Sequence, residues 1–506
     1  MDKVKNKPNI VFITIDALRK DHLGCYGYTK NTSPFIDSLA KKSFIFDRAY
    51  STGPDTPHSF PGLFTSNYCL VNNAFSIKGS KCTLAEVFKE NGYHTIGFNA
   101  SNPWVSSYQG YKRGFDSFFE FEDLHLGFND SKNFRKVLSD KKAEAIKNKI
   151  RKIYSKSRLL KKIIYSRRYI YEVSTVLTNF KAPDCIIRKN KLRKEFLREI
   201  EKIICGHNNQ PFFLWLHFMD VHEPYCPPKE NQKNLGFNYP DYTINHLARR
   251  VRFPLFKIGE RQLRKIVNLY DAEINFVDRQ LRKIISVLKG KYDENMLIIL
   301  TSDHGESFHD HKQLCHPPVL YNELINVPLI IHLPGQSNQV RTKELVSHLD
   351  LLPTLVEYIG LNISSMTRKE IQGYSFSGIL SGNIPKFKRK FAFSEVAYGE
   401  YNQILKLNPN DLTGKNKRYS VVSKKWKLIW DRGENKLELY NLEKDFQERS
   451  NLIGKNPELV KLLHKRIIKE KQRSELSYLT GKLSQIRCLI PVKKDGFHTK
   501  TSLTGV

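Results

Sequence analysis

Short, nearly continuous apolar runs that alternate with helical patterns are the feature that most constrains the fold of this 506-residue chain. The apolar runs are Asn9–Ile15, His94–Phe98, Phe212–Phe218, Met296–Thr301 and Val327–His332. Between them, helical spacing is found at Ser33–Lys42, Leu84–Asn91 and Leu263–Leu288. Strands that are apolar on both sides must be covered on both faces, as the central strands of parallel sheets are. The pattern therefore predicts an α/β fold with a central, mostly parallel sheet flanked by helices.

The pattern changes after about residue 375, which predicts a second, smaller α+β unit. Alternating strand patterns lie at Tyr419–Val422, Lys425–Trp430 and Leu437–Asn441, and Asn456–Lys469 has helical spacing. Alternation is typical of an antiparallel sheet with one covered face. We therefore expect a large domain over residues 8–375, a small antiparallel-sheet subdomain over 376–475 and a basic tail over 476–506.

The chain is strongly basic, and half of its excess charge lies in one segment. Lys and Arg number 83 against 51 Asp and Glu, a formal net charge of +32. Residues 131–200 contain 22 Lys or Arg and 6 Asp or Glu, with apolar residues at roughly helical spacing. This segment is interpreted as a basic helical insertion, either solvated or in peripheral contact with an acidic membrane or another polyanion. The charge favours an anionic partner, and no specific nucleic-acid motif accompanies it.

The cysteines and the N-terminus bear on the compartment. The eight cysteines are scattered, with no C-x-x-C pair. Residues 1–15 show no secretory signal pattern, and no apolar stretch of membrane-spanning length occurs. We therefore expect a cytoplasmic protein with reduced thiols, and peripheral attachment to a membrane stays open.

Polar clusters follow three of the predicted strands. Asp16 follows the first, Asp220 and His222 follow Phe212–Phe218, and Asp303 and His304 follow Met296–Thr301. Chemistry in such folds gathers at the carboxyl ends of the strands. Adjacent carboxylate and imidazole side chains suit a divalent cation, although Ser302, Asp303 and Glu306 also fit a helix N-cap. Asp16 and Asp303 together predict one ion between two strand ends.

Thr56 is the candidate nucleophile. It precedes Pro57 in the stretch 51–66 and has the pattern of an N-cap residue followed by Pro at the first helical position. A hydroxyl at a helix start lies beside free backbone N–H groups, which attract an anionic substrate. The capping and catalytic interpretations therefore coincide at this residue.

These blocks resemble the sulfatases of the alkaline-phosphatase superfamily over about residues 8–452. The resemblance is carried by N-I-V-F-I-T-I-D-A-L-R at 9–19, T-P-H-S-F-P-G-L-F-T-S at 56–66, H-F-M-D-V-H-E-P-Y at 217–225, Y-D-A-E-I at 270–274, T-S-D-H-G-E at 301–306, V-P-L-I at 327–330, H-L-D-L-L-P-T-L at 348–355 and L-Y-N-L-E-K-D at 439–445. It implies an alkaline-phosphatase-like fold and a metal-dependent hydrolase.

The resemblance also implies roles for individual residues. Asp16, Asp303 and His304 match the metal ligands, and Thr56 matches the nucleophile, which would also contact the metal. His222 matches a substrate-binding and leaving-group position. His316 lies where related enzymes place a Lys or His near the substrate anion, with Lys312 as its nearest rival.

Three departures from the sulfatase pattern change the expected chemistry. Thr56, His58 and Phe60 replace the C/S-x-P-x-R block, so formylglycine is not expected. The usual Asp-Asp pair is Asp16–Ala17. The Gly-Lys-Trp-His block is replaced by residues 97–102, where Asn99 and Asn102 are candidate donors to the substrate anion.

We therefore expect one divalent ion, Ca²⁺, Mn²⁺ or Zn²⁺, and a Thr56 alkoxide that attacks a sulfate or phosphate ester. The substrate is expected to be an anionic small molecule, a glycan or a lipid-linked ester. One alternative is a transferase that moves a phosphoryl-linked head group to a glycan or lipid by phosphodiester chemistry. Another is a non-catalytic polyanion-binding protein that uses the basic segment 131–200.

Overall fold

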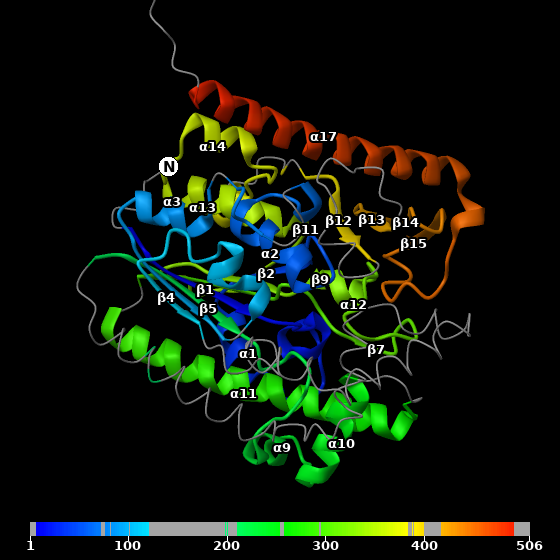
Figure 1. Ribbon diagram of the computed structural model, residues 1–506. Coiled ribbons are helices and arrows are strands. Elements are labelled where there is room, and N and C mark those ends of the chain that lie inside the picture. The colour runs from blue at the N-terminus through cyan, green and yellow to red at the C-terminus, as the bar shows by residue number, and fades with distance from the viewer. Residues whose placement is uncertain are drawn as a thin grey trace, which may run out of the picture.

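The computed structural model confirms the mostly parallel sheet (Figure 1). It describes residues 7–71, 76–120, 198–200, 210–252, 258–292, 295–382, 387–398 and 416–489, with positions 81, 101, 199 and 388 left out. The large sheet has nine strands in the order β11-β2-β10-β6-β1-β5-β3-β4, and β9 pairs with β2. Its strands are β1 Asn9–Ile15, β2 Phe44–Tyr50, β3 His94–Asn99, β4 Ser117–Glu120, β5 Phe212–Phe218, β6 Met296–Thr301, β9 Asn326–Val327, β10 Leu329–His332 and β11 Val340–Ser347.

Helices cover both faces of this sheet, as the doubly apolar strands require. The α-helices of the described residues are α1 Pro34–Ala40, α2 Thr56–Thr65, α3 Leu84–Glu90, α9 Lys229–Asn234, α10 Asp241–Arg252, α11 Glu260–Tyr292, α12 Asn322–Ile325, α13 Leu351–Ile359, α14 Ser365–Glu370, α15 Ser377–Leu380 and α17 Pro457–Leu489. Alternate residues of β1 enter two separate cores. Val11 and Ile13 pack with α1 and α11 on one face, whereas Ile10 and Phe12 pack with α2, α3 and α13 on the other.

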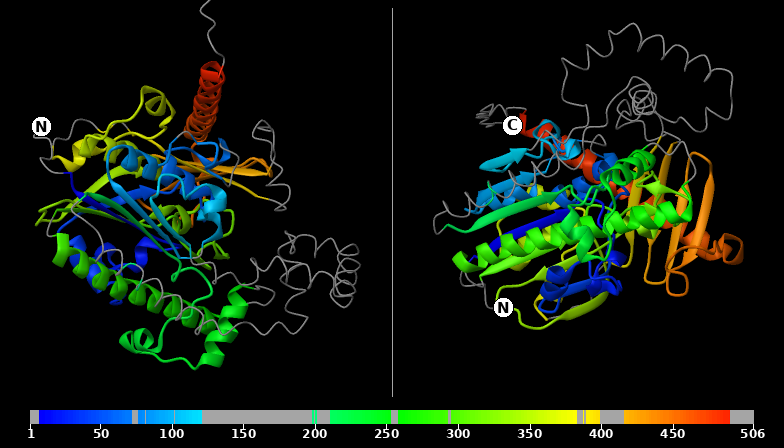
Figure 2. Two further views of the ribbon diagram at one scale, coloured as in Figure 1. Left: turned by 60° about the vertical axis from the view of Figure 1, so that its left-hand side comes forward. Right: turned by 90° about the horizontal axis from the view of Figure 1, so that it is seen from below.

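A four-stranded antiparallel sheet stands beside the large one (Figure 2). Its strands are β12 Ala392–Ala397, β13 Lys417–Val422, β14 Trp426–Asp431 and β15 Lys436–Asn441, and a separate hairpin is formed by β7 Ser307–Phe308 and β8 Leu314–Cys315. Leu463 and Ile467 of α17 are buried against β13, β14 and β15. The small subdomain expected from the alternating pattern is therefore present, with β12 as a strand that the pattern did not reveal.

Two sequence predictions differ from the structure or fall outside it. The closing helix does not end at Lys469 but continues to Leu489, so the first part of the predicted tail 476–506 is helical. The many Lys and Arg residues in this part of α17 are good helix formers, although they make the apolar periodicity difficult to recognise in the sequence. The basic insertion predicted at 131–200 lies outside the described residues except at 198 and 200. Among the described helices, none combines the length and the apolar character needed to cross a bilayer.

The cysteines differ from the expectation of reduced thiols at one position. Cys25, Cys69, Cys82 and Cys315 are free thiols. Cys226, which is fully buried in the core, is disulfide-bonded. The prediction of reduced thiols is therefore wrong for Cys226, and the cytoplasmic location that rested on it stays a prediction.

Glu395 of β12 should make the stability of the protein depend on pH. Its buried carboxylate accepts a hydrogen bond from the N–H of Leu70 at 2.8 Å. Burial raises the pKa of Glu395 from 4.5 to about 7. The folded protein therefore keeps a proton that the unfolded chain releases, so stability is fully present below pH 4.5 and is lost as the pH rises through about 7. The loss amounts to about 3 kcal/mol.

Urea unfolding at a series of pH values tests this expectation. In Glu395→Gln the free energy of unfolding should fall less between pH 5 and pH 8 than in the wild type. Glu90→Gln, which changes an exposed carboxylate at the end of α3, is the matched control and should keep the wild-type slope. Equal slopes in all three proteins would show that the pKa of Glu395 is not raised in the folded state.

Candidate active site

The predicted site residues converge because four neighbouring strands end at one edge of the sheet. β6, β1, β5 and β3 are adjacent and parallel. Thr14 of β1 is in register with Thr301 of β6 and with His217 of β5. Asp16 and Asp303 therefore follow their strands at the same level. This edge is where ligands bind in open α/β sheets.

Asp16, Asp303 and His304 form a fully buried group with the geometry of a metal site. One ligand atom from each residue lies within 4.8 Å of the others. His304 Nε2 is 3.5 Å from Asp16 Oδ1 and 3.6 Å from Asp303 Oδ2. The Nδ1 of His304 lies 2.7 Å from the Gly305 carbonyl oxygen, which orients Nε2 toward the carboxylates. No helix follows residue 304, so the alternative N-cap interpretation of Ser302 and Asp303 is wrong.

The hydrogen bonds of the two carboxylates leave oxygens for a cation. Asp303 Oδ1 accepts the N–H groups of Ala17 and His304, at 3.2 and 2.9 Å. Asp16 Oδ1 is buried and has no hydrogen-bond partner in the described part of the chain. A buried carboxylate oxygen without a hydrogen bond is costly unless a cation contacts it. The donor set of two carboxylates, one imidazole and a hydroxyl therefore fits a divalent ion.

The electrostatics of the pair support the same conclusion. Burial alone would raise the pKa of Asp16, but positive charge on His222 and His304 and a hydrogen bond from His217 lower that pKa below its usual range. Burial and the charge of Asp16 raise the pKa of Asp303. The metal-free pair therefore favours one ionised and one protonated carboxyl. A divalent cation would keep both ionised.

Thr56 lies directly over this group, at the start of α2. Its Oγ1 donates to Asp303 Oδ2 at 3.0 Å and lies 3.3 Å from Asp16 Oδ2. The N-cap is Asp55, whose carboxylate accepts the N–H of His58, and Thr56 is the first helical residue. The prediction that Thr56 itself caps the helix is therefore wrong. Because Asp55 takes that role, the Thr56 hydroxyl is left to face the carboxylates.

Asn102 belongs to the site, whereas Asn99 supports it. Asn102 Oδ1 accepts the N–H of Trp104 at 3.0 Å, which fixes the amide and directs Nδ2 inward. That Nδ2 lies 2.8 Å from Asp16 Oδ2 and 3.3 Å from Thr56 Oγ1. The amide of Asn99 is occupied by backbone groups of residues 102 and 105. Direct contact of Asn99 with a substrate anion stays a prediction, and the hydrogen bonds of its amide do not support it.

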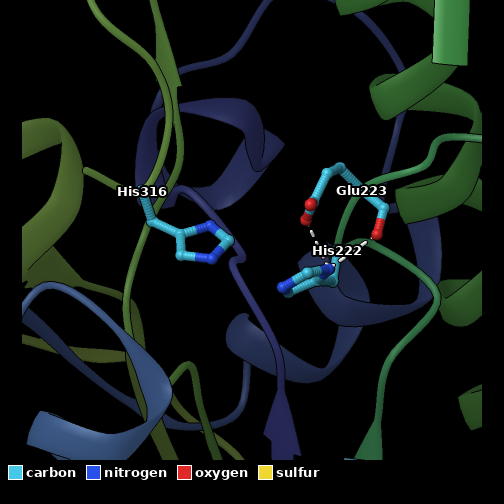
Figure 3. Close-up of side chains that lie close together, drawn as sticks. All are labelled: His222, Glu223 and His316. Atoms are coloured by element: carbon cyan, nitrogen blue, oxygen red, sulfur yellow. Dashed lines mark hydrogen bonds and ion pairs between the residues drawn. The ribbon is translucent and has the colours of Figure 1, made fainter. Parts of the chain in front are cut away.

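His222 and His316 lie side by side (Figure 3), and His316 is next to His304 of the buried group. Their ring centroids are 4.8 Å apart, and the His316 ring is also 4.8 Å from that of His304. Burial would lower the pKa of His222, but the charges of Glu223 and Asp16 raise it to about 10. Lys312 is exposed in the turn between β7 and β8, where its N–H bonds to the His309 carbonyl. The structure therefore brings His316, and not Lys312, into the site.

His217 is a site residue that we did not predict. It is fully buried on β5, with Nδ1 at 2.9 Å from Thr14 Oγ1 and Nε2 at 3.3 Å from Asn102 Nδ2. Phe60, which replaces the Arg of the sulfatase block, packs edge-on against the His217 ring at 4.9 Å. The sequence did contain a signal for His217, because it is a histidine inside an otherwise apolar strand. For Glu223 and Glu306 the only signal was their position within or next to the motifs.

Comparison with known proteins agrees with this arrangement. The Sulfatase family model matches residues 8–361, and the model of the N-sulphoglucosamine sulphohydrolase C-terminal region matches 312–473. An arylsulfatase of Clostridium perfringens is 23% identical over 94% of this chain and 96% of its own. A Delta 4,5-hexuronate-2-O-sulfatase of Bacteroides thetaiotaomicron is 24% identical over 91% of this chain and 87% of its own.

A solved structure gives the same result for the fold. The phosphonate monoester hydrolase of Agrobacterium radiobacter superposes with a TM-score of 0.64 at 19% identity, over 92% of this chain and 96% of that one. The extent of the family match, which exceeds half of the chain, together with the ordered blocks at the strand ends shows that this chain belongs to the sulfatase family of ester hydrolases.

Proposed function

We propose that the protein cleaves a sulfate or phosphate ester with Thr56 Oγ1 as the nucleophile and a divalent metal as its activator. The observation that carries this proposal is the position of the Thr56 hydroxyl, 3.0 Å from Asp303 and 3.3 Å from Asp16 at the start of α2. A hydroxyl held between two carboxylates would lose its proton readily once a cation is bound there.

Asp16, Asp303, His304 and Thr56 would hold the ion, and the donor set is compatible with Ca²⁺, Mn²⁺ or Zn²⁺. A bound ion supplies positive charge that lowers the pKa of the hydroxyl and neutralises the ester oxygens. Asn102 Nδ2 would donate to an oxygen of the transferring group, since it already lies 3.3 Å from Thr56 Oγ1. His222 and His316 would stabilise negative charge on that group and on the leaving oxygen.

The reaction then takes two displacement steps. Thr56 Oγ1 forms a bond to sulfur or phosphorus while the bond to the leaving alcohol breaks, and the alcohol oxygen takes up a proton. Water next attacks the same atom and releases the Thr56 hydroxyl. A formylglycine hydrate can expel sulfate by returning to the aldehyde, but a threonyl ester cannot, so the second displacement is required.

The substrate class follows from charge and from the relatives. The net charge of +32 favours an anionic substrate. The Bacteroides relative is named for action on a sulfated hexuronate. We therefore propose an anionic glycan or a lipid-linked ester. Thr56 also favours a second candidate, transfer of the phosphoryl-linked group to a sugar or lipid acceptor, because a threonyl ester can be attacked by an acceptor hydroxyl as well as by water.

A substrate panel tests the proposal. The purified protein, supplied with Ca²⁺, Mn²⁺ or Zn²⁺, should hydrolyse at least one among aryl sulfate, phosphomonoester, phosphodiester and phosphonate substrates, and chelation should abolish the activity. Mass spectrometry of the peptide 51–66 should show unmodified threonine. An aldehyde in that peptide, or equal activity after chelation, would contradict the mechanism.

A further inference from the structure

A chain of buried polar side chains leads to the Asp16 carboxylate from the neighbouring strand. It begins at Trp215 of β5, whose Nε1–H donates to Thr14 Oγ1 on β1 at 3.0 Å. Thr14 Oγ1 lies 2.9 Å from Nδ1 of His217, the residue opposite it in the register of β1 and β5 (Figure 1). The chain ends at Asp16, because His217 Nε2 lies 3.6 Å from Asp16 Oδ2. Trp215, Thr14 and His217 are fully buried, and the proposed reaction gives none of them a role.

The donors and acceptors of this chain fix the tautomer of His217. The indole N–H of Trp215 can only donate, so the Thr14 oxygen accepts there. The Thr14 hydroxyl hydrogen then goes to His217 Nδ1 at 2.9 Å, because its other acceptor, the Leu216 carbonyl oxygen, is 3.5 Å away. A neutral imidazole that accepts a hydrogen bond at Nδ1 carries its own hydrogen on Nε2. His217 therefore presents an N–H group to Asp16.

Two aromatic rings hold the imidazole of His217 in this orientation. The Trp215 ring stacks on it, with centroids 5.8 Å apart and an interplanar angle of 17°. The Phe60 ring of α2 meets it edge-on, at 4.9 Å and 86°. A side chain in a close-packed interior cannot turn without displacing its neighbours. The direction of the Nε2–H group is therefore set by β5 and α2.

We infer that His217 is a positioning residue for Asp16 and that Thr14 fixes the tautomer this role requires. Asp16 Oδ2 accepts from the Asn102 amide at 2.8 Å and faces the Nε2–H of His217 at 3.6 Å. Asp16 Oδ1 lies 3.5 Å from His304 Nε2 and has no hydrogen bond in the described part of the chain. The two nitrogen donors beside Oδ2 thus turn Oδ1 toward the metal ion. Outer partners of this kind orient the ligands of metal sites.

This role depends on one atom of the imidazole, the Nε2 nitrogen. A Gln side chain places its amide near the position of Nε2, whereas the shorter Asn side chain places its amide near the position of Nδ1. If His217 only filled the core, the two amides would have similar effects on metal binding. The inference deepens the proposed function and rests on it for the presence of the metal ion, but not for the identity of the nucleophile.

Isothermal titration of the full-length, metal-free protein with Ca²⁺, Mn²⁺ and Zn²⁺ in turn tests the inference without reference to activity. For the ion that the wild type binds, the Kd should rise by about 10- to 100-fold in His217→Asn, the scale for outer partners of metal ligands. His217→Gln should bind the ion more tightly than His217→Asn. His332→Asn changes another buried histidine of the same sheet, whose Nδ1 lies 2.7 Å from the Lys42 carbonyl oxygen. It is the matched control and should keep the wild-type Kd.

Thr14→Val and Thr14→Ser test the tautomer separately. Valine has the shape of threonine without the hydroxyl, so Nδ1 loses its donor and the ring is free to present a lone pair to Asp16. The Kd should therefore rise in Thr14→Val and return toward the wild-type value in Thr14→Ser, with the circular dichroism of all variants unchanged.

Three outcomes would overturn the inference. The first is a wild-type Kd in both His217→Asn and Thr14→Val, and the second is an equal loss of affinity in His217→Asn and His217→Gln. The third is a wild type that binds none of the three ions, which would overturn the metal site as well. Full activity in Thr56→Ala would contradict the proposed nucleophile and leave this inference standing, because the Kd is measured without substrate.

Discussion

Thr56→Ala should lose hydrolysis by about 10³-fold or more, the scale seen when a catalytic nucleophile is removed. Thr56 Oγ1 is the hydroxyl between Asp16 and Asp303, and alanine leaves no atom that can form the covalent ester. Thr56→Ser keeps the hydroxyl at the start of α2 and should retain measurable activity. Initial rates on the best substrate of the panel, with saturating metal, provide the measurement.

Trapping the covalent intermediate tests directly whether Thr56 is the nucleophile. Rapid acid quenching of the wild type during turnover should leave the peptide 51–66 heavier by one sulfuryl or phosphoryl group, and the same peptide of Thr56→Ala should be unmodified. Equal thermal unfolding of the three proteins would show that α2 is intact, because Asp55 caps the helix independently of residue 56. Full activity in Thr56→Ala would exclude Thr56 as nucleophile.

Asp303→Asn should lose the buried metal ion and, with it, nearly all activity. Asp303 Oδ1 is held by the N–H groups of Ala17 and His304, so Oδ2 is the oxygen directed to the ion and to Thr56. An amide of the same size removes the negative charge. We expect the affinity for the ion to fall by more than about 10²-fold, since even changes in outer partners of metal ligands cost 10- to 100-fold.

Isothermal titration of the dialysed protein measures this loss. Asp21→Asn is the matched control: it changes another carboxylate of the 15–28 segment, one that is 55% exposed and paired with Arg19. It should bind the ion as the wild type does. If Asp303→Asn bound the ion with unchanged affinity, the group of Asp16, Asp303 and His304 would not be the metal site.

The candidate metal ligands could be predicted because they follow apolar strands. The register that pairs Thr14 with Thr301 places Asp16 and Asp303 two residues further along two adjacent parallel strands. Local patterns were sufficient for that step and also indicated His304 and Thr56 as candidates, and the resemblance to sulfatases then assigned roles to His222 and His316. The same local pattern misassigned the helix cap, because Asp55 and Thr56 are both good capping residues and only the backbone conformation distinguishes them.

Residues that act through contacts distant in sequence were not predictable in this way. Asn102 and Asn99 have the same side chain and lie three positions apart, but only Asn102 directs its amide to Asp16. The difference arises from the turn around residues 102–105, which occupies the Asn99 amide with backbone groups. Lys312 and His316 were likewise alternative candidates for contact with the substrate anion. The structure distinguishes them because Lys312 is exposed in the β7–β8 turn.

Local sequence patterns were enough to predict the α/β class of this protein, the strand ends that carry its carboxylates, and Asp16, Asp303 and His304 as candidate metal ligands, because strand periodicity and adjacent motifs are local properties. The folded arrangement was needed to show that Thr56 faces those carboxylates, that His217 and Asn102 lie behind them, and that His222, Glu223 and His316 come together. Those side chains come from β5, from the start of α2, and from the segments after β3, β5 and β8. Their distances therefore depend on how the sheet is ordered and twisted, which no local pattern encodes.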